Sequence, residues 1–575
     1  MYRKNKRSQQ PLLISNVHEL PARSLQILKG SWAATFREAV FLHIREERFA
    51  VLYATCPSRP NVPVNVLMGL EILKGWFGWS DEELYGHFLF DLQVRYALCC
   101  DNFGEGDFDL RTLYYFRQAV SEYALKEKIN LIQVAYADIT DQQLKTFEVK
   151  TGMQRMDSTD IASNIADLSR LELLITVVQR LYRDLSAEDQ ARYGALFGPY
   201  IKEGAGQYTY RIKGKETVWA EIQRVGQVLY SLLEQLQVGY GQEAIYATAQ
   251  RFFDENFSLS EEQVKAKQNQ EISAGCLQSV DDLEASYRVK GGHAHKGYVA
   301  NLSETCDPTN PVQLVTQVSV APNRTSDQQL LKQDVPAIQQ RMELHHLVND
   351  GEYHGPSVEG VLRKANVEQS LTALTGTLPD RSEGKKVLAD FAMSLDEQSN
   401  VTAATCPAGH CATIYPSPKG QSFRLCFDPA TCANCPFYQQ HQCPVELRHD
   451  QTACQLKVPK ERAASSQRRR RFEQTKEAAR ALRPAVEATM FQLTCHMPGD
   501  KVPVRGRFRV TTLVLCSALA VNARRIDRYL KDKQRGKLTK KQSLAGDSSP
   551  LLRFFNAIGR LFYRPVSLFR PLSFC

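Results

Sequence analysis

Three acidic residues, far apart in the sequence, have the type and the surroundings of a metal-dependent catalytic site. Asp157 stands in MQRMDSTDIASN, Asp350 in HHLVNDGEYHG and Glu487 in ALRPAVEATMFQL. Hard cations such as Mg²⁺ or Mn²⁺ prefer a few carboxylate oxygens, and a substrate phosphate completes their coordination shell. Two such ions can activate a nucleophile and stabilise the leaving oxygen of a displacement. We therefore predict a phosphoryl-transfer site in which all three acids are catalytic metal ligands.

Each acid also has an ordinary structural interpretation. The Asp-Ser-Thr sequence at Asp157 is good local hydrogen-bonding chemistry for a turn, and Asn-Asp-Gly at Asp350 is typical of a turn. Glu473 and Glu477 lie on the same helical segment as Glu487, so a register shift is an alternative for the third acid. The occurrence of all three acids in one chain favours the catalytic interpretation.

Positive charge is concentrated in the last part of the sequence. The net charge is +9, and residues 501–575 hold 17 Lys or Arg against 3 Asp, a local balance of +14. Clustered basic residues gain free energy by releasing counterions from nucleic acid, which favours DNA-backbone binding. A solvated basic tail without function is the alternative. The basic residues that we predict to contact DNA are Arg483, Lys501, Arg505, Arg468, Arg469, Arg470 and Arg471.

A group of six cysteines falls within one short stretch: Cys406, Cys411, Cys426, Cys432, Cys435 and Cys443. The Cys432-x2-Cys435 pair has zinc-knuckle spacing, and Cys443 with Cys406 or Cys411 could complete four tetrahedral ligands. His410 and His441 could replace a sulfur. A Zn²⁺ ion held in this way would brace the segment rather than do chemistry, because a closed site leaves no open position. Reduced, buried cysteines in a loop-rich insert are the alternative.

Length and composition describe an ordinary soluble protein of several domains. At 575 residues the chain is too long for one core, which predicts three or four domains. Its apolar stretches fall well short of the roughly 20 residues that a membrane span needs. The N-terminal sequence MYRKNKRSQQPLLIS lacks an apolar signal core, so we expect a cytoplasmic protein. Its 15 cysteines are then expected to be reduced or metal-bound rather than paired.

The first half of the sequence is predominantly helical in its pattern. Apolar residues at three- and four-residue spacing predict a helical domain, a candidate for DNA binding, over residues 1–135, with Ser80 as an N-cap before an acidic first turn. A short strand follows within 145–165, and Asp157 is expected near its end. Residues 166–284 then predict a helical insert.

The second half predicts an α/β fold. Residues 285–375 read as strand, strand, helix, strand, helix, which together with the Asp157 strand gives a mixed sheet flanked by helices. Asp350 falls at the C-terminal end of the fourth strand, where open sheets place ligands. A Cys-rich insert occupies 376–460, the Glu487 helix and a basic helix occupy 461–530, and 531–575 read as a flexible basic tail.

The order of the motifs carries a family resemblance. The run Met156-Asp157-Ser158-Thr159, the later Val348-Asn349-Asp350-Gly351-Glu352-Tyr353 and the helix Arg483-Pro-Ala-Val-Glu487 follow one another, the last with the basic continuation VRGRFRVTTLVLCSALAVNARRI. They resemble the DDE-type transposases of bacterial insertion sequences, in a branch with a helical N-terminal domain and a cysteine cluster in the catalytic domain. The resemblance covers roughly residues 50–160 and 285–530.

The sequence departs from the family pattern at several positions. Relatives often carry a Tyr three residues before the Arg and a Lys seven residues after the Glu, where this chain has Arg480 and Thr494. The missing Lys removes an expected phosphate contact, for which Lys501 or Arg505 is a candidate replacement. The interval from Asp157 to Asp350 is 193 residues (350 − 157), because the helical block intervenes. That block is either an inserted domain or a feature of the branch.

The resemblance implies a ribonuclease-H-like core in which Asp157, Asp350 and Glu487 hold two Mg²⁺ ions. It implies hydrolysis at the ends of a DNA element and joining of the freed 3′-hydroxyl to target DNA. Double-stranded DNA would be the partner, a homodimer or larger assembly the active form, and the bacterial nucleoid the location. Two other functions stay open: a metal-dependent nuclease without strand transfer, and a zinc-stabilised DNA-binding protein whose acids no longer act.

Overall fold

The computed structural model describes most of the chain, and of residues 537–544 it gives the backbone alone. The described ranges are 1–7, 14–54, 60–260, 263–374, 379–396, 398–497 and 501–544. The chain divides into two compact units, residues 1–525 and 526–575, with the boundary inside the last helix. Among the described helices, none is both long enough and apolar enough to cross a membrane.

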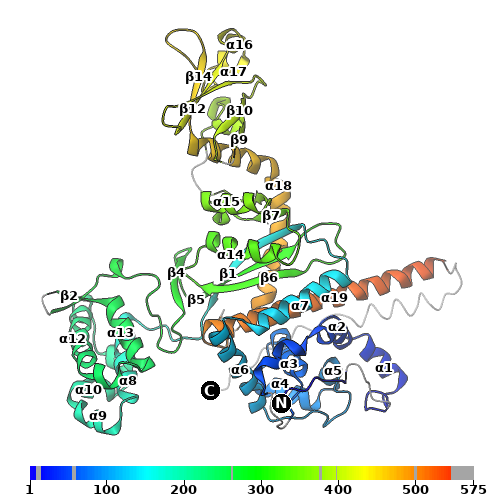
Figure 1. Cartoon of the computed structure of the whole chain (residues 1–575), viewed down its shortest axis with the longest axis vertical. Helices are drawn as coiled ribbons and strands as arrows, with labels where there is room; N and C mark the ends of the chain where they lie inside the picture. Colours follow the sequence, from blue (N-terminus) through cyan, green and yellow to red (C-terminus); the bar gives the residue numbers. More distant parts are fainter. Residues whose placement is uncertain are drawn as a thin grey trace. The chain divides into compact units, whose positions relative to one another are not determined.

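A six-stranded mixed sheet forms the centre of the first unit (Figure 1). Its order is β4-β5-β1-β7-β8, and β6 shares the outer edge of β5 with β4. β5 is antiparallel to its three neighbours, whereas β1, β7 and β8 run parallel. This confirms the predicted α/β class and is consistent with a ribonuclease-H-like domain. The strands are β1 (Met153–Ala162), β4 (Ser286–Lys290), β5 (His293–Thr305), β6 (Val315–Pro322), β7 (His346–Asn349) and β8 (Glu368–Leu371).

Glycine is required where β5 begins to pair with β1. Gly297 lies opposite Ala162 and has φ of +150°, a conformation that L side chains rarely adopt. A Cβ at this position would lie 2.3 Å from the carbonyl oxygen of Ile161. The two strands therefore approach closely, and from this point they stay in register up to the pair Gln154 and Thr305.

Helices cover both faces of the sheet. On one face α14 (Asp327–Gln339) and α15 (Pro356–Lys364) form an apolar cluster with Met156 of β1. Ser326 begins α14 with a capping box, since its side chain accepts a hydrogen bond from the Gln329 amide. The other face, which carries Leu302, packs against α7 (Leu131–Thr146), α18 (Lys460–Thr494) and α19 (Arg507–Leu544).

The N-terminal helices share their core with the sheet rather than forming a core of their own. Buried side chains of α2, α3 and α6 belong to the same apolar cluster as Leu302 of β5 and the first half of α19. Gly75 of α3 allows the closest crossing, because a Cβ there would lie 2.9 Å from the Ser517 amide nitrogen of α19. The predicted N-cap at Ser80 is confirmed, with a complete capping box. The helices are α1 (Ala22–Lys29), α2 (Trp32–Ala39), α3 (Val64–Phe77), α4 (Asp81–Phe90), α5 (Leu92–Ala97) and α6 (Arg111–Glu127).

The helical block between β1 and β4 has a separate apolar core. Its centre is made by buried residues such as Leu174, Leu229 and Phe252. Ser169 caps the first helix by accepting a hydrogen bond from the Glu172 amide. The elements are α8 (Arg170–Arg183), α9 (Ala187–Arg192), α10 (Gly194–Ile201), α11 (Ala205–Tyr210), α12 (Lys215–Tyr240), α13 (Ala244–Asn256), β2 (Phe257–Ser260) and β3 (Gln263–Ala266).

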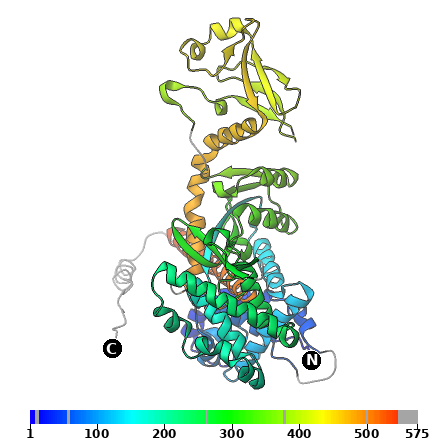
Figure 2. The same cartoon turned by 90° about the vertical axis from the view of Figure 1, so that its left-hand side faces the viewer.

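The Cys-rich segment is a small β-rich module with its own core. Phe391, Leu425 and Val458 are buried in it together with Ala463 from the first turn of α18. The sheets run β11-β12-β14-β13 and β10-β9. Figure 2 shows α18 leaving this module as one continuous helix. The elements are β9 (Ala392–Leu395), β10 (Val401–Thr405), β11 (Thr413–Pro416), β12 (Ser422–Phe427), α16 (Pro429–Ala433), α17 (Pro436–Gln439), β13 (Glu446–Leu447) and β14 (Cys454–Pro459).

Three expectations about element boundaries need correction. β1 continues to Ala162, so Asp157 lies in the middle of its strand and not near the end. Strands β4 and β8 were not predicted individually. The expected flexible tail is wrong for residues 531–544, because α19 continues to Leu544. Residues 545–575 lie outside the described part of the chain.

Candidate active site

Strand register brings Asp157 and Asp350 together. β1 and β7 are parallel neighbours, and Arg155 pairs with Val348. Asp157 follows Arg155 by two residues, and Asp350 follows Val348 by two residues. Because successive side chains along a strand point to opposite faces, the two aspartates lie on the same side of the sheet. Both aspartates line one small pocket. The structure thus juxtaposes two acids that are 193 residues apart in the sequence.

Each aspartate also makes a local hydrogen bond, but the turn interpretation is wrong for Asp157, which lies within strand β1. Asp350 caps the short 3-10 helix Gly351–Tyr353, where its Oδ1 accepts from the Glu352 amide at 2.8 Å. Asp157 accepts from the Ser158 amide at 2.9 Å, also through Oδ1. A carboxylate carries lone pairs on both oxygens, so these bonds are compatible with a metal ligand role.

Burial and neighbouring acids raise the pKa of Asp157 to about 6. Desolvation is the largest cause, and the charges of Asp350 and Asp327 add to it; the Ser158 amide and the Arg483 guanidinium act in the opposite direction. The nearby Arg483 guanidinium only partly offsets the burial and mutual repulsion of the two carboxylates, because the pKa of Asp157 is still raised. Their oxygens are the donors that Mg²⁺ and Mn²⁺ prefer, so the pair fits a divalent cation of this kind.

Glu487 lies next to this pocket on α18, bound to a basic partner. Leu482, Arg483 and Val486 line the pocket with the two aspartates. Arg483 Nε lies 2.8 Å from Glu487 Oε1, one helical turn away. Among the described residues, no three His, Cys, Asp or Glu side chains are close enough to hold a common metal ion. Glu487 is therefore held by Arg483 and is not at ligand distance from both aspartates.

The alternative register for the third acid is not favoured by the pocket. Glu473 pairs instead with Arg381, at 3.0 Å. The part of α18 that lines the aspartate pocket begins at Leu482, after Glu477. Of the three glutamates considered, Glu487 is the one adjacent in sequence to a pocket-lining residue.

Further charged residues around β1 were missed by the sequence reasoning. Asp327, at the start of α14, is buried and accepts a hydrogen bond from the Ser158 hydroxyl at 2.7 Å. A hydrogen bond with Asp327 is the largest cause that raises the pKa of Glu352. Arg288 of β4 approaches Glu352 at 3.7 Å and Asp160 at 4.0 Å. No local motif marked Asp327, because its role depends on how α14 packs against the sheet.

The four consecutive arginines lie on the first half of α18, and Arg468 and Arg470 contact other elements of the protein. Arg468 pairs with Glu359 of α15 at 3.1 Å, and Arg470 donates to the Asp390 carbonyl at 2.8 Å. Arg468, Arg470 and Arg471 line a groove of about 1030 Å³. Arg469 is half-buried on the same helix. This groove is the described surface on which the basic run would meet DNA.

Lys501 and Arg505 lie beyond the C-terminal end of β1 rather than in the aspartate pocket. Lys501 forms a parallel bridge with Ala162, and its ammonium donates to the Ile165 carbonyl at 3.3 Å. Arg505 donates to the Asn164 carbonyl at 2.6 Å. Both residues thus hold the segment that follows β1. At Thr494, where relatives have Lys, the hydroxyl donates to the Met490 carbonyl.

Four of the six predicted cysteines line one small cavity in the Cys-rich module. The thirteen described cysteines are all free thiols. Cys411 is exposed and Cys426 lies on β12, and neither lines the cavity. His410 lines this cavity and His441 does not. Burial is the largest cause that raises the pKa of the Cys432 thiol, and the nearby Cys454 of β14 raises it further. The cavity-lining cysteines are Cys406, Cys432, Cys435 and Cys443.

The sheet order and the paired acids on adjacent parallel strands define the class of protein, an α/β protein with a ribonuclease-H-like core. A family model described as "Transposase DDE domain" matches residues 405–527. Residues 405–527 are thus similar to the DDE domain of transposases, which supports the family resemblance. The matched range contains the six cysteines and Glu487, whereas Asp157 and Asp350 precede it. No curated protein and no solved structure matches the chain.

Proposed function

We propose that this transposase cuts the ends of a bacterial insertion sequence and joins the freed 3′-hydroxyls to target DNA. The observation that carries the proposal is the meeting of Asp157 and Asp350 beside the α18 turn that bears Arg483 and Glu487. A DDE-family match over the same helix supports it. Double-stranded DNA would be the substrate, and a homodimer or larger assembly would hold two element ends together.

Asp157, Asp350 and Glu487 would hold the Mg²⁺ or Mn²⁺ ions. When bound, these cations supply the positive charge that activates an attacking hydroxyl and stabilises the leaving oxygen. Arg483 keeps Glu487 beside the pocket, and its own charge acts on both aspartates. The same guanidinium has the planar geometry that suits a phosphate, so it is also the residue best placed to contact the scissile strand.

The test is a cleavage and joining assay with a donor DNA of defined ends. Asp157→Ala and Asp350→Ala are expected to lower Mg²⁺-dependent cleavage by at least about 1000-fold, because a charge-stabilising ligand is lost. Glu343→Ala serves as the control, because Glu343 is an exposed acid that does not line the pocket. Cleavage without a joined product would favour the nuclease. Equal activity of wild type and both variants would leave only the DNA-binding role.

We also propose that Cys406, Cys432, Cys435 and Cys443 bind a structural Zn²⁺. Support comes from their convergence on one cavity as free thiols, and from the knuckle spacing of the middle pair. Side-chain rotation would have to bring the sulfurs to a common ion, since no described group stands at that distance. A metal there would tie the turn after β10 to the helices α16 and α17.

Metal analysis tests this proposal. The purified protein should contain one zinc per chain, and Cys435→Ser should lose both the zinc and several degrees of thermal stability, because structural zinc contributes directly to folding. Cys411→Ser is the matched control and should keep its zinc, since Cys411 lies outside the cavity. Full zinc occupancy in Cys435→Ser would contradict the assignment.

A further inference from the structure

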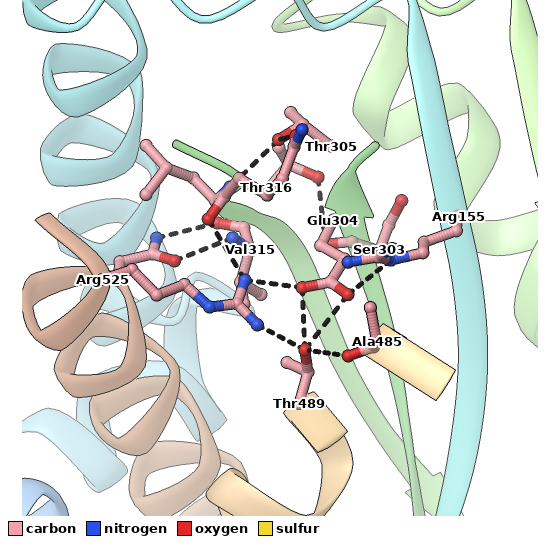
Figure 3. Close-up of polar contacts among 12 residues, drawn as sticks. Arg155, Ser303, Glu304, Thr305, Val315, Thr316, Ala485, Thr489 and Arg525 are labelled. Carbon is pink, nitrogen blue, oxygen red and sulfur yellow. Dashed lines mark hydrogen bonds and ion pairs between the residues drawn. The ribbon is translucent and has the colours of Figure 1, made fainter. Parts of the chain in front are cut away.

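A buried polar cluster joins the sheet to the helix that bears Glu487 (Figure 3). At its centre is Glu304 of β5, whose side chain is completely buried. Its Oε1 accepts from Arg155 Nε at 2.6 Å, and its Oε2 accepts from Arg525 Nη1 at 2.6 Å. Arg155 is its direct cross-strand neighbour on β1. A buried carboxylate needs such partners, because an unpaired charge in the interior is costly.

Thr489 of α18 completes the cluster from the helix side. Its hydroxyl oxygen lies 2.9 Å and 3.1 Å from the two oxygens of Glu304, and 2.9 Å from the Ala485 carbonyl. Arg525 Nη2 donates to the same hydroxyl oxygen. A hydroxyl has one proton to give, and the Arg525 contact does not use it, so the proton is shared between the Glu304 oxygens and the Ala485 carbonyl as acceptors. Figure 3 shows the Thr489 and Arg525 side chains converging on this carboxylate.

The cluster is attached to two of the three elements that bear proposed catalytic acids, β1 and α18. Arg155 is two residues before Asp157 on the same face of β1. Thr489 is two residues after Glu487 on α18. Arg155 also donates to the Leu482 carbonyl at 3.2 Å, so α18 is fixed to the sheet on both sides of the turn that carries Arg483 and Glu487.

Apolar packing alone would fix the rotation of α18 about its axis less specifically than the polar cluster does. Val486, Met490 and Leu493 contribute non-directional contacts to the shared core. The hydrogen bonds of Glu304 are directional and lie in a low-dielectric interior, where an unmade bond is expensive. Turning α18 by one residue, about 100°, would withdraw Thr489 from Glu304. The polar cluster therefore selects one rotation of the helix about its axis.

We propose that Glu304 is a positioning residue: with Arg155, Arg525 and Thr489 it sets the rotation of α18, so that Glu487 and Arg483 are presented to the Asp157 and Asp350 pocket. This rests on the proposed function, in which those acids bind the catalytic metal. The cluster touches no substrate itself, since it is buried beneath the helix.

The first variant removes the contact between the Thr489 hydroxyl and Glu304 while keeping the shape of the residue 489 side chain. Thr489→Val is isosteric and leaves both arginine pairs of Glu304 in place. Its kcat for DNA cleavage is expected to fall about 10- to 100-fold with KM for DNA within about twofold, because misplacing a catalytic group slows the chemical step. Thr489→Ser restores the hydroxyl and should recover most of kcat. Thr494→Val is the matched control, because Thr494 bonds only the Met490 carbonyl on the same helix.

A second variant addresses Glu304 directly. Glu304→Gln keeps the size of the side chain but removes the counter-charge of the buried Arg155 and the partly buried Arg525. It is expected to lose kcat at least as strongly as Thr489→Val. If Glu304→Gln fails to fold, the three threonine variants still decide the proposal, because each retains the ion pairs.

Hydrogen exchange gives a measurement that does not depend on activity. Thr489→Val should exchange the amides of residues 482–493 about tenfold faster than Thr494→Val does, because local opening becomes easier. Unchanged protection in Thr489→Val, or a loss of activity confined to KM, overturns the positioning role. If wild type cleaves no DNA, the proposed function fails, and the exchange comparison alone then decides whether Glu304 holds α18.

Discussion

At the scale of single residues, Asp157 shows how the ionised form of a proposed metal ligand is destabilised by its own surroundings. Its carboxylate is buried beside Asp350 and Asp327, and the cause that raises its pKa most is desolvation. In the absence of a cation, ionisation of this group opposes folding. Such a group is suited to bind a metal ion, because the positive charge of the ion stabilises the ionised carboxylate.

Replacing Asp157 by Asn should therefore stabilise the metal-free protein at pH 8. The pKa of Asp157 rises from 3.8 to about 6 on folding. The protonated form favours folding, so this contribution is fully present below pH 3.8 and is lost as the pH rises through about 6. At 1.36 kcal/mol per pKa unit, the ionised group costs up to about 3 kcal/mol.

Denaturant unfolding in a chelating buffer measures this effect. Asp157→Asn should exceed wild type in free energy of unfolding at pH 8, and the difference should vanish near pH 4. Asp167→Asn is the control, because its carboxylate is exposed and paired with Lys296, which lowers its pKa. A variant that is less stable than wild type at pH 8 would contradict the account of Asp157.

At the scale of elements, the contact between β1 and β5 is set by one glycine. Gly297→Ala would place a methyl group 2.3 Å from the Ile161 carbonyl oxygen in a backbone conformation disfavoured for alanine. We expect a loss of about 2–4 kcal/mol in the free energy of unfolding, since strain and overpacking add. The strand shift should also displace Asp157 and lower cleavage.

A second glycine provides the comparison. Gly360 lies inside α15, and a Cβ there would meet nothing within 4 Å. Gly360→Ala should therefore be neutral or stabilise by up to about 1 kcal/mol, because alanine is the better helix former. Thermal unfolding of both variants gives the result. A Gly297→Ala protein as stable as Gly360→Ala would show that β1 and β5 tolerate wider spacing.

At the scale of the whole molecule, the N-terminal helices and the six-stranded sheet share one apolar core. Tyr136 of α7 donates to the Val315 carbonyl of β6 at 3.2 Å, and Asn522 of α19 contacts both Gln143 and Val315. The apolar cluster runs through all of these elements. The helical block 166–284 and the Cys-rich module have cores of their own.

Truncation should reflect this division. A chain lacking residues 1–149 is expected to lose cooperative unfolding of the catalytic sheet, because one side of its core is exposed to water. Isolated residues 166–284 should unfold cooperatively, since their core is internal. Circular dichroism melts of both fragments provide the measurement. A folded, soluble sheet in the first fragment would mean that the N-terminal helices form a separate domain after all.

The sequence by itself indicated a chemistry, which stays a prediction, and determined most of the elements. Hydrophobic spacing and caps are local properties, so the helix start at Ser80 and the strand around Asp157 could be predicted from neighbouring residues. The order of the motifs was enough to indicate the family, which the match over residues 405–527 supports.

Only the tertiary structure decided which residues meet. The pairing of Asp157 with Asp350 depends on the β1–β7 register, and the selection of Cys406 over Cys411 depends on how loops close around a cavity. Glu304 stands in a strand with no motif, and its proposed role depends on its contact with Arg525, from a distant part of the chain. Such contacts are long-range, and local hydrogen-bonding and periodicity carry no information about them.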